Sequence, residues 1–116
     1  MKVITWNVDS LRARFERARA LLARHGPDVL CLQETKVTDA DFPFEAFTEL
    51  GYHAASFGQR AYNGVAILSR SPLDEVRRGF PGDPAPDQSR VISALAGGIR
   101  LVDVYVVNGK SVDHAD

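Results

Sequence analysis

The sequence has few of the residue types and runs that mark several large classes of protein. It contains one cysteine, Cys31, so neither an intrachain disulfide nor a thiolate zinc cluster can form. No apolar run approaches the roughly 20 residues that a membrane-spanning helix needs. The opening residues turn polar too soon for a secretory signal, and neither a Walker loop nor a GxGxxG motif occurs. These absences exclude disulfide-rich, zinc-finger and membrane classes, and a reducing, cytoplasmic setting is expected.

The composition is that of a soluble globular domain. The chain has 116 residues, of which 45% are apolar and 25% charged, enough for one domain with a core of its own. The net charge of −1 is unevenly spread, because residues 10–25 carry five arginines against one glutamate and residues 26–51 carry six acids against one lysine. This asymmetry allows a basic face beside an acidic pocket, or simply a solvated helix followed by an acidic loop.

The first third of the sequence predicts a strand–helix–strand unit. Residues 2–6 and 29–32 are short apolar runs typical of strands, and the second run suits a strand buried on both faces. Between them, apolar residues recur at spacings of four, three and four from Leu11 to Leu22, which marks one face of a helix. Gly26 and the proline after it end that helix. The two strands are therefore expected to be parallel and joined by a right-handed crossover.

The remainder predicts a short helix over residues 43–50 and mostly antiparallel strands. The strand candidates cover residues 52–57, 64–69, 90–96 and 99–107, and the last two are joined by a Gly-Gly hairpin turn. The fold class is mixed α/β. If the domain ended after these strands, one face of its sheet would have no layer to pack against. We therefore expect residues 1–116 to be part of a larger domain, to which they supply mainly one sheet.

Polar side chains follow both strands of the strand–helix–strand unit. Asn7 and Asp9 come directly after the first strand, and Glu34 follows the second. The carboxyl ends of parallel strands meet at one edge of a sheet, where ligands of open α/β sheets bind. Three hard oxygen donors at that edge would suit Mg²⁺ or Mn²⁺. The alternative is that Asn7 and Asp9 form a turn and Glu34 is an exposed loop acid.

Two further clusters pair a tyrosine with an amide. Tyr105 and Asn108 close the last strand candidate, while Tyr62, Asn63 and Gly64 open an earlier one. Taken alone, each cluster is equally explained by a packed tyrosine beside a β-turn.

Together these segments resemble the exonuclease III-type AP endonucleases of the endonuclease/exonuclease/phosphatase superfamily. The similar stretches are WNVDSLRAR at 6–14, PDVLCLQETK at 27–36, YNGVAILSR at 62–70 and VYVVNG at 104–109, with weaker support from DQSRVISA at 87–94. Their order along the chain is that of the family. The resemblance implies a DNase I-like fold, in which two mixed sheets pack as a sandwich flanked by helices.

The resemblance also implies roles for individual residues. Asn7, Asp9 and Glu34 would surround a Mg²⁺ or Mn²⁺ ion. Tyr105 would place its hydroxyl near the scissile phosphate, and Asn108 belongs to the same catalytic motif.

A second group of residues is expected to contact DNA. Tyr62, Asn63 and Gly64 match a loop that approaches the DNA backbone, and Arg12 and Lys36 lie within motifs that contact phosphates. Members of the family hydrolyse phosphodiesters 5′ to abasic sites and at 3′ ends of double-stranded DNA. We expect a monomer acting on such DNA, with no membrane partner.

Two departures from the family pattern limit these expectations. Val107 replaces a proline. The later Gly-Asp-x-Asn and Ser-Asp-His motifs are missing, so the chain carries about half of an active site. We therefore expect residues 1–116 alone to cleave abasic DNA poorly or not at all. The alternatives are a non-catalytic remnant or fragment that binds metal or DNA, and a superfamily phosphodiesterase acting on another phosphoester.

Overall fold

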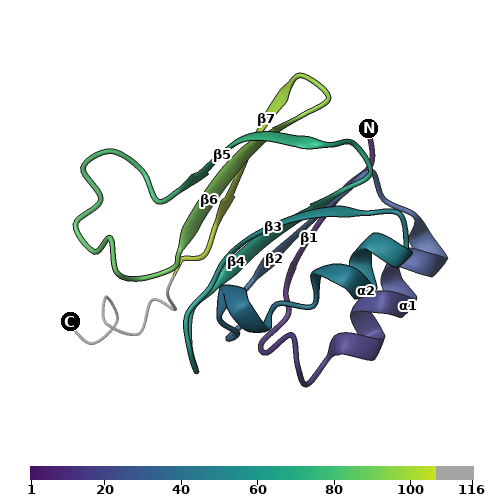
Figure 1. Ribbon diagram of the computed structural model, residues 1–116, viewed down its shortest axis with the longest axis horizontal. Helices are drawn as coiled ribbons and strands as arrows, with labels where there is room; N and C mark the ends of the chain where they lie inside the picture. Colours follow the sequence, from purple (N-terminus) through teal and green to yellow (C-terminus); the bar gives the residue numbers. More distant parts are fainter. Residues whose placement is uncertain (107–116) are drawn as a thin grey trace, which may run out of the picture.

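The computed structural model describes residues 1–106, which form two β-sheets with helices on one side (Figure 1). The first sheet has the order β1-β2-β4-β3, and the second has the order β5-β6-β7. The strands of the first sheet are β1 (Val3–Asn7), β2 (Val29–Gln33), β3 (His53–Phe57) and β4 (Val65–Ser69). Those of the second are β5 (Leu73–Arg78), β6 (Val91–Ala96) and β7 (Ile99–Val104). The helices are α1 (Phe15–His25), the 3₁₀ turn η1 (Asp39–Asp41) and α2 (Phe44–Glu49).

The predicted strand–helix–strand unit is confirmed. Strands β1 and β2 pair in parallel, and β2 is buried on both faces until its last residue. Helix α1 ends at Gly26, which adopts a left-handed backbone and donates its N–H to the Leu22 carbonyl. The helix begins at Phe15, however, and not near Leu11. Residues before it form a turn held by the Ser10 hydroxyl, which accepts a hydrogen bond from the Ala13 amide.

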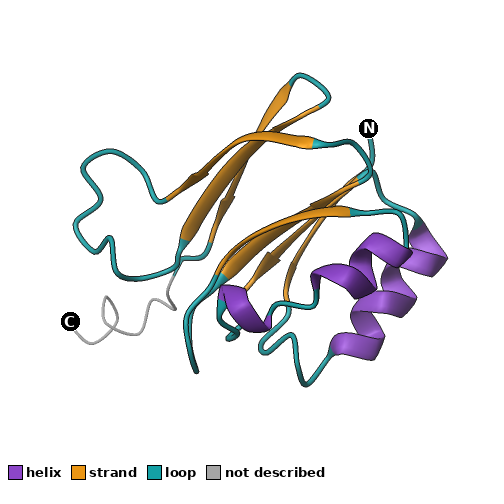
Figure 2. Cartoon of the chain, viewed as in Figure 1, coloured by secondary structure: helices purple, strands orange, loops and turns teal. Residues whose placement is uncertain are grey.

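Two apolar layers hold the molecule together, one on each face of the first sheet (Figure 2). Helices α1 and α2 cover one face, where Leu22 and Phe47 are buried against β2 and β4. The second sheet covers the other face, where Ile67 of β4 packs with Ile92 of β6. Cys31 lies in this inter-sheet layer, and burial raises its pKa to about 12, as for an unreactive core thiol.

The second sheet corrects two expectations. Residues 1–116 do not supply mainly one sheet, because three strands build a separate sheet against the first. Strand β5 was not anticipated, since most of its residues are charged and exposed, as suits an edge strand with an irregular register near Glu75. The hairpin at Gly97 and Gly98 is confirmed by the pairing of β6 with β7, but β7 ends at Val104, short of the predicted limit. Among the described residues, no helix could span a membrane.

Candidate metal and nucleic-acid site

Backbone hydrogen bonds join the loops that follow the strands along one edge of the structure. The amide of Ser10 donates to the Glu34 carbonyl at 2.9 Å, which ties the loop after β1 to the loop after β2. The amide of Thr35 donates to the Gly64 carbonyl at 3.1 Å, and that of Gly64 donates to the Ser89 carbonyl at 2.8 Å. The loops are thereby connected across both sheets, so a displacement of one is transmitted to its neighbours.

Left-handed backbone conformations concentrate in these same loops. Among the described non-glycine residues, seven have positive φ, and six of them lie here: Asp9, Ser10, Glu34, Lys36, Ala61 and Asn63. Each such residue costs on the order of 1 kcal/mol and persists because the surrounding contacts hold it. The strain is typical of a functional edge, and it turns the side chains of Asp9, Glu34 and Lys36 toward one another.

The three predicted metal ligands converge as the strand topology requires. The Asn7 amide nitrogen donates to Glu34 Oε1 at 3.2 Å, and the Asp9 backbone amide donates to Asn7 Oδ1 at 3.1 Å. These contacts join the end of β1 to the loop after β2. The contact from the Asp9 amide to Asn7 is also a local turn, so the alternative of turn residues beside a loop acid describes residues 7–9 as well.

Lys36 occupies the space between the two carboxylates. Its ammonium lies 2.8 Å from Asp9 Oδ1 and 3.2 Å from Glu34 Oε2. The hydrogen bonds from Lys36 and the one with Glu34 lower the pKa of Asp9, and those to Asp9 and Glu34 raise the pKa of Lys36. The two carboxylates thus already hold one cation, the ammonium of Lys36.

The donor chemistry fits a hard divalent ion. Two carboxylates and one amide oxygen match the oxygen preference of Mg²⁺ or Mn²⁺, and Mg²⁺ often binds through one or two carboxylates together with water and substrate phosphates. Among the described residues, no group of three or more His, Cys, Asp or Glu side chains is arranged to hold a metal. Asn7, Asp9 and Glu34 would therefore supply at most part of the ligands of such an ion, and not a closed metal cage.

Tyr105 reaches this cluster from the second sheet. Its backbone amide donates to the Arg90 carbonyl at 2.8 Å. Burial raises the pKa of its phenol, and the nearby Glu34 carboxylate raises it further by its charge and as a hydrogen-bond acceptor. The phenol is therefore protonated at neutral pH and can donate a hydrogen bond. Asn108, the other predicted catalytic residue, lies outside the described residues.

The loop predicted to approach DNA divides into an exposed and a buried part. Tyr62 is 61% exposed, whereas Asn63 is buried and donates from its side chain to Gln59 Oε1 at 3.0 Å. Gly64 packs so tightly against Thr35 that a Cβ at this position would overlap the threonine hydroxyl. The buried Asn63 side chain and the close backbone packing of Gly64 therefore shape the loop, and of these three residues Tyr62 presents its side chain to solvent.

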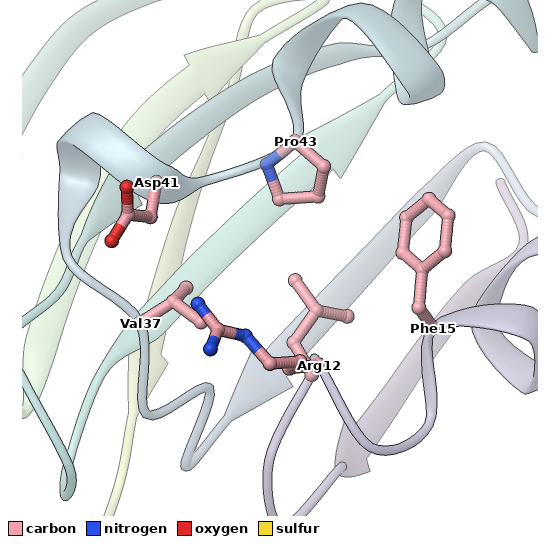
Figure 3. Close-up of a pocket in the computed structure, with 6 residues that line it drawn as sticks. Arg12, Phe15, Val37, Asp41 and Pro43 are labelled. Atoms are coloured by element: carbon pink, nitrogen blue, oxygen red, sulfur yellow. The ribbon is translucent and has the colours of Figure 1, made fainter.

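A basic cavity adjoins the cluster. It has a volume of about 570 Å³, and its cationic lining comes from Arg12, Lys36 and Arg60. A smaller, mainly apolar pocket of about 270 Å³ shares Arg12 with it. Figure 3 shows the Arg12 side chain extending past Val37 toward Asp41. Sequence reasoning missed Arg60, although its position two residues before Tyr62 in the same loop was the available signal.

Comparisons with known proteins identify the family of the chain. The model of the endonuclease/exonuclease/phosphatase family matches residues 4–115, nearly the whole chain. The chain belongs to this family. A curated relative, exodeoxyribonuclease III of Haemophilus influenzae, is 39% identical over 98% of this chain and 44% of its own length. The chain thus spans less than half of that relative.

Solved structures give the same assignment of the fold. A 3′ phosphatase NExo from Neisseria, bound to a product DNA hairpin, is 46% identical with a TM-score of 0.87, over 94% of this chain and 42% of its own. An AP endonuclease from Archaeoglobus fulgidus is 39% identical with a TM-score of 0.87, over 91% of this chain and 41% of its own. The predicted DNase I-like, two-sheet α/β fold and the family resemblance are both confirmed.

Proposed function

We propose that residues 1–116 belong to a DNA-repair phosphodiesterase of the exonuclease III or AP endonuclease type. The observation that carries the proposal is the convergence of Asn7, Asp9 and Glu34 from one sheet with Tyr105 from the other. The names of the relatives support a DNA substrate. The reaction is hydrolysis of phosphodiesters 5′ to abasic sites and at 3′ ends. A monomer acting in the cytoplasm remains our expectation.

Asn7, Asp9 and Glu34 are the residues that would hold Mg²⁺ or Mn²⁺ in this proposal. Such an ion supplies polarisation of the phosphoryl oxygen and stabilisation of the leaving oxygen when it is bound. The protonated phenol of Tyr105 donates a hydrogen bond to a phosphate oxygen, because its pKa is raised by burial and by Glu34. Lys36 balances the charge of Asp9 and Glu34.

The basic cavity is the proposed path of the DNA backbone. Arg12, Lys36 and Arg60 line it, so phosphate groups there would meet three cations. Tyr62 is exposed in the same loop as Arg60 and offers an aromatic face for contact with a sugar or base. In this proposal Asn63 and Gly64 contribute by fixing the loop, Asn63 through its buried side chain and Gly64 through its close backbone packing.

We propose further that this chain alone cleaves abasic DNA poorly or not at all, since the sequence lacks the later motifs of the family. The second candidate is a non-catalytic segment that binds metal or DNA. Partial ligation by Asn7, Asp9 and Glu34 favours this reading for the isolated chain.

The test combines Mn²⁺ binding with incision of a labelled duplex that contains one abasic site. Isothermal titration should show Mn²⁺ binding to the wild type and its loss in Glu34→Gln. Glu45→Gln, which removes an exposed acid in the first turn of α2, should leave Mn²⁺ binding unchanged. Robust Mg²⁺-dependent incision abolished by Glu34→Ala would overturn the proposed inactivity, while absence of Mn²⁺ binding in the wild type would overturn the metal assignment. Faster hydrolysis of phosphoinositides than of abasic duplex would redirect the proposal to another phosphoester.

A further inference from the structure

Asp103 is an acid buried between the two sheets. It lies on β7, is 2% exposed, and is the only residue with a formally charged side chain among the buried polar residues in the described part of the chain. Its Oδ1 accepts a hydrogen bond from Gln33 Nε2 at 2.7 Å, while its Oδ2 is buried without a partner. The surrounding layer is otherwise largely apolar. An apolar residue of similar size would avoid the cost of burying this carboxyl.

Gln33 connects Asp103 to the first sheet. It is the last residue of β2, and its amide nitrogen also donates to Thr5 Oγ1 on β1 at 2.8 Å. The shorter bonds of that amide go to Thr5 and Asp103, with a longer one of 3.4 Å to the Cys31 carbonyl, and a single side chain links β1 and β2 with β7. Apolar packing between sheets is non-directional and tolerates small displacements. A short hydrogen bond between defined atoms instead fixes the offset of β7 against β2.

This polar link lies directly beneath the candidate site. Gln33 immediately precedes Glu34, and Asp103 lies on β7 two residues before Tyr105, which follows the last residue of that strand. We propose that Gln33 and Asp103 are positioning residues that fix the end of β7, and with it Tyr105, relative to the loop that carries Glu34. The inference rests on the proposed function only in taking Glu34 and Tyr105 as site residues.

Substitutions of Asp103 distinguish an effect on the position of Tyr105 from an effect on the free energy of unfolding. Asp103→Asn keeps an Oδ1 that can accept the hydrogen bond from Gln33. Asp103→Val removes the acceptor and inserts a residue that suits a buried strand. Because replacing a buried acid by an apolar residue is often neutral or stabilising, we expect Asp103→Val to retain or raise the free energy of unfolding and yet to lose the alignment of Tyr105 with Glu34. If Asp103 served only to stabilise the fold, the alignment of Tyr105 with Glu34 would be lost only together with unfolding free energy.

The experiment measures nuclear Overhauser effects between the Tyr105 ring and the Glu34 methylenes in the metal-free chain, together with urea unfolding. The wild type and Asp103→Asn should show these effects, and Asp103→Val should lose them while remaining folded. Gln33→Met, which keeps the side-chain length without the donor, should also lose them and decides the question if Asp103→Val does not fold.

Persistence of the Overhauser effects in a folded Asp103→Val or Gln33→Met protein would overturn the inference, as would their loss in Asp103→Asn. The measurement needs neither bound metal nor DNA cleavage. A failure of the proposed nuclease function would therefore appear in the Mn²⁺ and incision assays, and it would not change the Overhauser effects measured here.

Discussion

The ammonium of Lys36 lies 2.8 Å from Asp9 Oδ1, an ion pair that joins the loop after β1 to the loop after β2. The same ammonium lies 3.2 Å from Glu34 Oε2. A cation thus already stands between the two carboxylates that we assign to metal binding, and a divalent ion must compete with it for them.

Replacing Lys36 with methionine should therefore strengthen Mn²⁺ binding. The expected gain is no more than about fivefold, because an exposed ion pair contributes little and no longer has to be broken. Isothermal titration with Mn²⁺ measures the change. Lys2→Met is the matched control, since the Lys2 side chain bonds the His25 carbonyl instead. Weaker Mn²⁺ binding in Lys36→Met would mean that the ammonium supports the site rather than competing for it.

Arg12→Ala should weaken binding of abasic duplex DNA and make it less sensitive to salt. One lost phosphate contact lowers the slope of log affinity against log salt concentration by about 0.9. Fluorescence anisotropy over a series of KCl concentrations measures both quantities. Arg77→Ala, on β5 in the second sheet, removes an equal charge away from the basic cavity and should leave the slope unchanged. Equal slopes in the Arg12 and Arg77 variants would argue against phosphate binding in that cavity.

The pH dependence of stability should carry the signature of Asp103. Burial raises its pKa to about 7, while the hydrogen bond from Gln33 acts in the opposite direction. Cys31 is the titratable neighbour that faces it. The folded state thus binds the Asp103 proton more tightly than the unfolded state, so this group's contribution to stability declines as the pH rises from about 4 to about 7.

Asp103→Asn should remove that decline. The difference in unfolding free energy between variant and wild type should grow by roughly 2–4 kcal/mol over this pH interval, since each pKa unit is worth about 1.4 kcal/mol. Urea unfolding at pH 4, 5, 6 and 7 measures it. A difference that stays constant with pH would show that Asp103 titrates normally.

Gly64→Ala should destabilise the chain by about 3 kcal/mol, because the new Cβ overlaps the Thr35 hydroxyl at a backbone φ of +99°. Gly82→Ala is the matched control. Gly82 has a φ of +81°, and its Cβ would meet nothing within 4 Å, so only the backbone strain of about 1 kcal/mol remains. Thermal unfolding distinguishes the two. Equal destabilisation by Gly64→Ala and Gly82→Ala would show that the loop around Gly64 shifts to accommodate the added methyl group.

Much of the fold was predictable because its signals are local. The alternation and length of apolar runs identified six of the seven strands, and Gly26 marked the end of α1. Strand β5 escaped because a solvent-exposed edge strand needs little apolar sequence. The start of α1 was misplaced because Leu11 is buried in the turn before the helix, and its spacing mimics a helical position.

The sequence by itself determined the parallel strand pair and the grouping of Asn7, Asp9 and Glu34, because parallel strands end at the same edge of a sheet. Only the tertiary structure decided what crosses from one sheet to the other. The approach of Tyr105 to Glu34 and the link from Gln33 to Asp103 join residues about 70 positions apart. Such contacts depend on how two separate sheets are offset when they pack, and no local periodicity encodes that offset.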